Sequence, residues 1–549
     1  MQKFPRHPRW HSLPVLFSLL IPVLLSAQSS QTASVSVRID VDPARLAEQP
    51  VASAWLSYNG DYTGRRYSSL AQINASNVQN LHAEWVFHAP NSSRLEVTPV
   101  AVDGVLFVTA ANDAYALDAQ TGRIVWHYAR PVTEGLIDDA SQHHNRGVAV
   151  WRSRVYLETD NAHLLCLDAR SGHLLWDVAY TDGNPNYGAT SAPLVVKDKV
   201  LVGTSGGDDG VRGFVAAFDA QTGKEAWRFW TIPAPGEFGS SSWPGESYKL
   251  GGGTTWMPGT FDPELNTIFW GTSNPSPDFD GGPRPGDDLY TDCLLALDPD
   301  TGKLKWHFQF TPHDLYDYDA VETPVLVDAI FRGQPRKLIV EANRNGFLYV
   351  LDRTNGTFLS ARKFSEKLNW ASGIDENGRP IRTDTKPSDA GTRVCPGLVG
   401  ATNWHSPTFN PDTSLFYFMA LESCDIYYLK EQKFVPGETY YATGVKHSEG
   451  DRGQKILLAY SLDGEKPAWR YEQSGDGHSS AGAMTTAGGL VFFGDDAHSF
   501  EAVDAKSGKP LWHFNTGQTI SASPMTYSVN KKQFIAIAAG ADIFTFTLP

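Results

Sequence analysis

Cysteine is scarce in this chain, with four residues in 549: Cys166, Cys293, Cys395 and Cys424. They form neither a CxxC nor a CxxCH motif, which excludes a covalently attached c-type haem and a cysteine-rich zinc site within this chain. Cys166 and Cys293 lie in apolar, strand-like runs and are expected to be buried thiols. Cys395 and Cys424 lie in turn-rich sequence, where an exported chain can oxidise them.

Basic residues are also fewer than acidic residues. The chain has 46 lysine and arginine residues against 61 aspartate and glutamate residues, a formal net charge of -15. Nucleic acid and anionic membrane surfaces are therefore poor partners. A basic partner protein is one interpretation of the charge, and solubility is the simpler one.

Long apolar runs are absent apart from LPVLFSLLIPVLL at 13–25. Basic residues precede this run and SAQ follows it, a layout that predicts a secretory signal peptide over 1–27, cleaved after Ala27. The run is short for a transmembrane helix, although an uncleaved anchor is the alternative. We expect a periplasmic or secreted protein, with an N-terminal extension over 28–50 and a single large domain over 51–549.

Helical periodicity is scarce as well, and a different pattern repeats. In each copy a strand ends at Asp, Thr/Ser-Gly completes a turn with glycine supplying a positive φ, and a second strand ends in Trp. The intact copies are ALDAQTGRIVW (116–126), CLDARSGHLLW (166–176), AFDAQTGKEAW (217–227), ALDPDTGKLKW (296–306) and AVDAKSGKPLW (502–512). Degenerate copies are VLDRTNGTFLS (350–360) and AYSLDGEKPAW (459–469), and LHAEW, ending at Trp85, is the tail of one more.

Short apolar runs precede these copies, as in GVLFVTA (104–110) and RVYLETD (154–160). Four short strands per repeat predict an all-β fold, a β-propeller of eight blades with each Trp packed between neighbouring blades. The long insertions 228–270, 275–292 and 361–400 are expected at one face, where a site would lie over the central channel.

One short stretch, LYDYDA at 315–320, raises a question of charge. In an extended chain Asp317 and Asp319 would point to the same face, and their charges would repel. Either a cation binds between them, or the segment is a solvated acidic turn.

The repeat, the opening WLSYNGDYTGRRYSSLAQIN (55–74) and GGGTTW (251–256) together resemble the pyrroloquinoline-quinone (PQQ) alcohol dehydrogenases of the methanol- and ethanol-dehydrogenase type, over about 50–549. The resemblance implies oxidation of an alcohol to an aldehyde or ketone, with electrons passed to a separate cytochrome c. It also pairs Cys395 with Cys424. Alternatives are a sugar or polyol dehydrogenase, and a non-catalytic propeller scaffold, which would keep the repeats but lose the site residues.

The resemblance implies a PQQ site, in which Trp256 of GGGTTW would be the floor beneath the cofactor. Arginine and hydroxyl donors suit PQQ because it is a tricarboxylate. The other positions that match PQQ-binding residues of the family are Glu96, Arg146, Thr190, Ser205, Arg344 and Asn403.

The same resemblance implies a metal site at Asp208, Asn274 and Asp317, with Asp319 as an additional carboxylate of the kind found in lanthanide-using members. These are hard oxygen donors, which suit Ca²⁺ or a trivalent lanthanide. In the family mechanism Asp317 would be the general base, and Arg344 would stabilise charge on the quinone oxygen. Asp208 stands where glutamate is usual, which shortens its reach.

Two segments depart from the family pattern. Ala140 and Ser141 stand where the family has adjacent cysteines, so the disulfide over PQQ is missing. His143 or His144 could instead shape the side of the PQQ site where that disulfide would lie, or could simply be exposed. SSAGAMTTAG (479–488) lacks a family tryptophan, so the substrate wall is expected to differ.

Overall fold

The computed structural model describes residues 39–549 except 91, 443, 449–452 and 476–478. The signal peptide predicted over 1–27 lies outside the described residues, as does 28–38 of the predicted extension. Within them the helices are short: α1 (Pro43–Leu46), α2 (Asp138–Ser141) and the 3-10 turns η1 (Val78–Asn80), η2 (Gly207–Asp209), η3 (Ser240–Ser242) and η4 (Ser247–Lys249). No helix among the described residues has the length and apolar character to cross a membrane.

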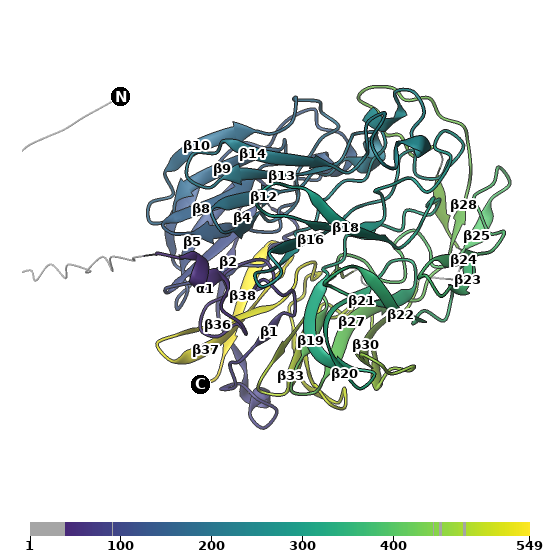
Figure 1. Ribbon diagram of the computed structural model, residues 1–549. Coiled ribbons are helices and arrows are strands. Elements are labelled where there is room, and N and C mark those ends of the chain that lie inside the picture. Colours follow the sequence, from purple (N-terminus) through teal and green to yellow (C-terminus); the bar gives the residue numbers. More distant parts are fainter. Residues whose placement is uncertain (1–38, 91, 443, 449–452, 476–478) are drawn as a thin grey trace, which may run out of the picture. The chain divides into compact units, whose positions relative to one another are not determined.

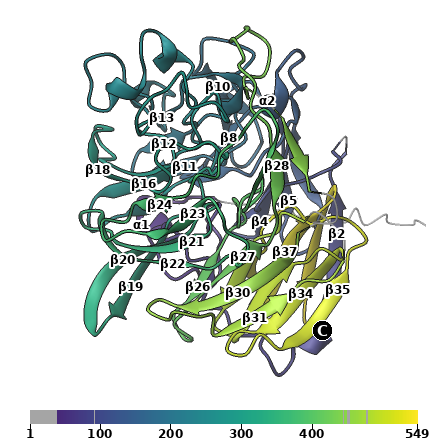
Figure 2. The ribbon, with the colours of Figure 1, turned by 90° about the vertical axis from the view of Figure 1, so that its right-hand side faces the viewer.

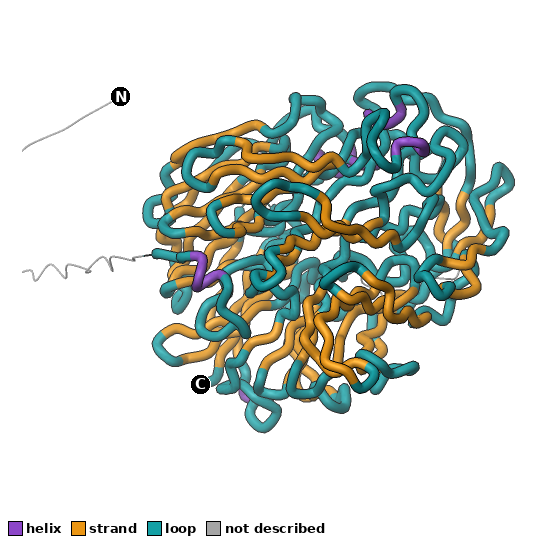
Figure 3. The backbone as a smooth tube through the Cα atoms, viewed as in Figure 1, coloured by secondary structure: helices purple, strands orange, loops and turns teal. Residues whose placement is uncertain are grey.

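Strands are the main regular structure and helices are few (Figure 3); the strands form seven four-stranded sheets and one five-stranded sheet among the described residues. In chain order, the first sheets contain β3 (Val100–Val102), β4 (Val105–Ala110), β5 (Asp113–Asp118) and β6 (Ile124–Tyr128); β7 (Ala149–Trp151), β8 (Arg154–Glu158), β9 (His163–Asp168) and β10 (Leu174–Ala179); and β11 (Leu194–Val196), β12 (Lys199–Val202), β13 (Phe214–Asp219) and β14 (Glu225–Trp230). The next contain β15 (Thr260–Asp262), β16 (Thr267–Gly271), β17 (Cys293–Leu297) and β18 (Leu304–Gln309); and β19 (Val325–Phe331), β20 (Gln334–Ala342), β21 (Phe347–Asp352) and β22 (Thr357–Lys363).

The remaining sheets come from the C-terminal part of the chain and two N-terminal strands. They contain β26 (Thr408–Asn410), β27 (Leu415–Leu421), β30 (Lys455–Ser461) and β31 (Trp469–Glu472); β1 (Tyr67–Ser68), β32 (Ala483–Thr486), β33 (Leu490–Gly494), β34 (Ser499–Asp504) and β35 (Pro510–Asn515); and β2 (His82–His88), β36 (Met525–Val529), β37 (Lys532–Ala539) and β38 (Asp542–Thr547). Residues of β27, β30, β33 and β34 share one apolar cluster, and Figure 2 shows β30 and β34 close together.

One sheet joins the two ends of the folded chain. Strand β2 pairs antiparallel with β38, with His82 opposite Thr547 and His88 opposite Asp542. Figure 1 shows this as a purple strand beside a yellow one. The N-terminal strand therefore completes a sheet whose other three strands are the last three of the chain.

The repeated motif forms the strand–turn–strand unit predicted from it. Strand β5 ends at Asp118, whose Oδ1 accepts hydrogen bonds from the backbone N–H of Gln120 and Thr121 and from the Thr121 hydroxyl. Gly122 then has φ +71°. The same bonds recur at Asp168, Asp219, Asp298 and Asp504.

The motif tryptophans contact the turn of the following sheet. The Trp126 indole donates to the Ala169 carbonyl at 2.9 Å, and its ring lies against Gly172, where an added Cβ would come within 2.7 Å of Cε3. Equivalent indole bonds join Trp176 to Gln221, Trp227 to Pro299, Trp469 to Ala505 and Trp512 to Leu81.

The predicted insertions are partly regular structure. Segment 228–270 contains the end of β14, the whole of β15 and most of β16, so the residues outside strands are 231–259 and the turn 263–266. Segment 361–400 carries a small hairpin, β23 (Ala371–Ile374) with β24 (Pro380–Arg382), and β25 (Thr392–Val394), which pairs with β28 (Asp425–Tyr427) beside β29 (Val445–His447). Strands as short as TFD carry too little alternation to be recognised in sequence.

The tryptophan–glycine contact can be tested with two glycines of similar backbone conformation. Gly302 (φ +69°) faces Trp227, with an added Cβ 2.5 Å from the ring, whereas Gly104 (φ +83°) has no atom within 4 Å of that position. Gly104→Ala should cost about 1–2 kcal/mol from left-handed strain, and Gly302→Ala about 1–3 kcal/mol more from overpacking. Urea unfolding of both variants measures the difference; equal losses would contradict the packing role.

Candidate functional site

A cavity of about 270 Å³ gathers side chains from distant parts of the chain. Ten of the eleven predicted cofactor, metal and catalytic residues line it: Glu96, Arg146, Thr190, Ser205, Asp208, Trp256, Asp317, Asp319, Arg344 and Asn403. Asn274 is the exception; it is buried, and its backbone N–H donates to Asp319 Oδ1 at 2.7 Å. The predicted residues are therefore brought into one place.

One side of the cavity is built around Arg146. Its guanidinium forms an ion pair with Glu96 at 2.6 Å and donates to the Thr190 hydroxyl at 2.7 Å. It also lies over the rings of Trp256 and Trp404, 5.0 and 4.5 Å from their centroids. Two aromatic rings and a carboxylate partner together hold the guanidinium in one orientation.

The other side is built around Arg344, which contacts both aspartates of LYDYDA. Nη2 lies 3.1 Å from Asp317 Oδ2, and Nη1 lies 3.0 Å from Asp319 Oδ2. The Trp256 indole also donates to Asp319 Oδ2, at 3.0 Å. The segment is a loop and not an extended strand, since Asp317 has φ +64°, yet both carboxylates reach the same guanidinium.

Negative charge exceeds positive charge on this side. Burial alone would lower the pKa of Arg344, but the carboxylates of Asp317 and Asp319 raise it above its ordinary value. Burial raises the pKa of Asp319, against the lowering effect of Arg344. Nearby Asp278 is buried, and its pKa is raised well above the usual range by burial and then by Asp208 and Asp317. A cation would relieve this repulsion.

The carboxylates alone do not form a complete metal cage. Across the described residues, no group of three or more His, Cys, Asp or Glu side chains is close enough to hold an ion. Asp208 comes from η2, between Gly206 and Gly210, both with left-handed φ. A cation here would therefore need ligands beyond the protein carboxylates, such as oxygen atoms of a bound cofactor.

Asp314 holds the loop that carries Asp317. Its two carboxylate oxygens accept the backbone N–H groups of Tyr316, at 3.0 Å, and Tyr318, at 2.8 Å, one on each side of Asp317. Tyr316 and Tyr318 are fully buried. The left-handed conformation of Asp317 is thus imposed by its neighbours.

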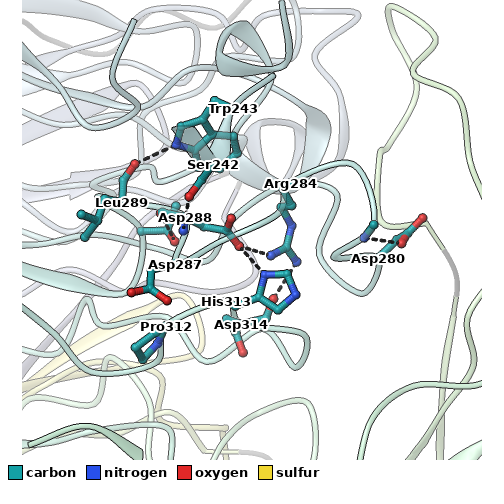
Figure 4. A network of polar contacts seen from close by, with 12 residues as sticks. Ser242, Trp243, Asp280, Arg284, Asp287, Asp288, Leu289, Pro312, His313 and Asp314 are labelled. Carbon is teal, nitrogen blue, oxygen red and sulfur yellow. Dashed lines mark hydrogen bonds and ion pairs between the residues drawn. The ribbon is translucent and has the colours of Figure 1, made fainter. Parts of the chain in front are cut away.

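Arg284 connects this loop to the insertion 275–292 (Figure 4). Its guanidinium donates to the carbonyls of Asp314, at 2.6 Å, and Asp278, at 2.9 Å, and also pairs with the Asp288 carboxylate. Asp288 in turn lies 3.2 Å from His313 Nδ1. Hydrogen bonds from the insertion therefore hold the loop that carries Asp314 and Asp317.

The predicted disulfide is confirmed: Cys395 and Cys424 are bonded, whereas Cys166 and Cys293 are buried free thiols. The bonded loop includes Leu398, whose carbonyl accepts a hydrogen bond from Arg344 at 2.9 Å.

Several lining residues were not predicted: Arg94, Gln142, Thr254 and Trp404. Arg94 stands two positions before Glu96 and pairs with it at 2.8 Å, and Trp404 follows Asn403 directly. Their positions beside predicted residues were the only sequence signal for Arg94 and Trp404.

The question whether His143 or His144 borders the site is resolved as well, since His144 lines the cavity and His143 pairs with Asp160 at 2.9 Å.

Comparison with known proteins gives concordant findings. The family model for the "PQQ: Glucose/ethanol/alcohol dehydrogenase, beta-propeller domain" matches residues 55–361 and 463–535. The chain is 38% identical to quinohemoprotein alcohol dehydrogenase ADH IIB of Pseudomonas putida, over 94% of this chain and 78% of that protein. It is 35% identical to the lanthanide-dependent methanol dehydrogenase of Methylacidiphilum fumariolicum, over 90% and 86%. A europium-containing methanol dehydrogenase structure superposes with a TM-score of 0.85 at 31% identity, covering 92% of this chain and all of that one.

The bracing of the loop yields a matched test. Asp314→Ala leaves two buried N–H groups without an acceptor, at about 1–3 kcal/mol each. Asp375 makes the same pattern of bonds, to Asn377 and Arg379, in the β23–β24 hairpin, where its side chain is less buried. We expect Asp314→Ala to lower the free energy of unfolding several-fold more than Asp375→Ala in urea titrations. Similar losses would show that Asp314 is an ordinary turn residue.

Proposed function

Because the chain belongs to the PQQ-dependent alcohol dehydrogenases, we propose that it oxidises a primary or secondary alcohol to an aldehyde or ketone with PQQ and a calcium or lanthanide(III) ion. The observation that carries this proposal is the composition of the cavity. Arg146, packed on Trp256, lines it together with Asp317 and Asp319, and both aspartates pair with Arg344. Oxidation of a sugar or polyol is the alternative.

We further propose that the chain is exported after removal of 1–27 and passes electrons to a separate, soluble cytochrome c.

We also infer that the propeller spans 51–549 and has eight blades, one for each large sheet. Its support is the set of Trp contacts from one sheet to the next, including Trp85 against Gly122, which links the sheet containing β2 to the first. In this interpretation the tryptophans dock neighbouring blades and are structural.

The cavity suits a planar tricarboxylate. Ser205 Oγ is buried and has no hydrogen-bond partner among the described residues, although Thr190 beside it is already bonded to Arg146. An unsatisfied buried hydroxyl costs free energy unless a ligand completes it. Arg146, Thr190 and Ser205 would bind the carboxylates of PQQ, Trp256 would lie against its plane, and Glu96 and Asn403 would complete the binding site.

The carboxylate side suits a hard cation. Asp208, Asn274, Asp317 and Asp319 offer only oxygen donors, which favour Ca²⁺ or a lanthanide over zinc or copper. Because these side chains alone form no closed cage, we expect a cofactor carboxylate to complete the ligand set. The excess negative charge favours the trivalent ion, since Coulomb attraction scales with the charge of the ion.

In the proposed mechanism PQQ, when bound, supplies the redox chemistry and the ion supplies Lewis acidity. Asp317 accepts the hydroxyl proton of the alcohol as general base. Arg344 orients Asp317 through their 3.1 Å contact and offers positive charge where negative charge develops. Asp314 and Arg284 keep that base in place.

The function is tested by loading the purified protein with PQQ and either Ca²⁺ or La³⁺, then assaying alcohols and sugars with a dye acceptor. We expect PQQ-dependent oxidation of alcohols, and a loss of about 10²–10⁴-fold in kcat for Asp317→Asn. Asp198→Asn, at an exposed side chain, is the control. Full turnover by PQQ-loaded Asp317→Asn would exclude its role as base, and a preference for sugars would favour the alternative substrate class.

The metal preference has its own test, in which Asp319→Ala should weaken the response to La³⁺ more than the response to Ca²⁺. The Trp256 indole donates to Asp319, so luminescence of Tb³⁺ sensitised by tryptophan reports binding without turnover. Activation of the wild type by Ca²⁺ alone, or an unchanged lanthanide titration for Asp319→Ala, would refute the lanthanide preference.

A further inference from the structure

Gln142, His144 and Arg146 form one wall of the cavity, and this wall contains no sulfur. All four cysteines of the chain are placed elsewhere: Cys166 in β9 and Cys293 in β17 are buried thiols, and the other two form the disulfide Cys395–Cys424. None of them lines the cavity. The groups that this wall presents to the cavity are an amide, an imidazole and a guanidinium.

The two consecutive histidines of this segment have different surroundings. His143 Nδ1 lies 2.9 Å from Asp160 Oδ2, and His143 does not line the cavity. His144 lines it together with Gln142, with Nδ1 3.3 Å from Glu96 Oε1. The sequence does not distinguish the two histidines, whereas in the structure only His144 lines the cavity.

Ion pairing does not account for the position of His144. Glu96 already has two arginine partners, Arg94 at 2.8 Å and Arg146 at 2.6 Å, so it needs no third cation. Burial lowers the pKa of His144 to about 4, with Glu96 opposing the shift, so the ring is neutral at pH 7. A neutral imidazole on a cavity wall is an aromatic surface with a hydrogen-bonding nitrogen.

We propose that His144 is a further cofactor-binding residue, whose imidazole covers the planar quinone from the wall that carries no disulfide. This inference rests on the proposed function, because the ligand it assigns is PQQ. A flat ring against a flat aromatic ligand gains contact area, and the Glu96 contact sets the orientation of the ring before the ligand arrives.

The test measures PQQ binding to the full chain in the presence of Ca²⁺ or La³⁺, by quenching of tryptophan fluorescence, without any turnover. His144→Ala should raise the Kd about five- to tenfold, as expected for loss of one aromatic contact. His143→Ala removes the neighbouring ring from outside the cavity and should stay within about twofold of wild type.

A second variant separates contact with the cofactor from an effect through Glu96. His144→Asn places an N–H donor where Nδ1 faces Glu96 but removes the ring, so it should bind PQQ as weakly as His144→Ala. Wild-type affinity in either His144 variant, or equal weakening by His143→Ala, would overturn the inference and leave the proposed function standing. A wild-type chain that does not bind PQQ would overturn both.

Discussion

The contact of one buried arginine with two aspartates constrains the rest of this site. Arg344 holds Asp317 and Asp319 at 3.1 and 3.0 Å, and each pair is worth about 5 kcal/mol before desolvation at an effective dielectric of 20. Separating the carboxylates from the guanidinium would leave like charges together in a poorly solvated place. The surrounding loops are accordingly fixed by Asp314, by Arg284 and by the disulfide near Leu398, none of which lines the cavity.

The β-propeller character was predictable because its determinants are local and repeated. An aspartate that accepts the N–H groups two and three residues on, followed by a glycine with positive φ, is a turn whatever surrounds it, as at Asp118 and Asp168. The irregular connections were less predictable. The sequence predicts an insertion over the whole of 228–270, since a strand of three residues such as β15 is too short to show alternation.

The site was predictable where single positions match a family motif, and not where the role of a residue comes from its neighbours in space. Trp404 lies against Arg146, a contact that its position beside Asn403 in the sequence does not specify. Asp314 resembles any acidic loop residue until its two oxygens are seen to accept Tyr316 and Tyr318. His143 and His144 are consecutive, yet only His144 lines the cavity, while His143 pairs with Asp160. The sequence alone does not show which of two adjacent side chains points into a cavity.

The pairing of β2 with β38 has a consequence for how the chain acquires its structure. His82 contacts a strand more than 450 residues later, so the last sheet cannot form until synthesis of the chain is complete. Contacts of such sequence separation carry a large loop-closure entropy and slow folding. Until then β2 has no partner strand, and both of its edges are exposed to pairing with another chain. Closure of this sheet is therefore a late step in folding, because it waits for the last three strands of the chain.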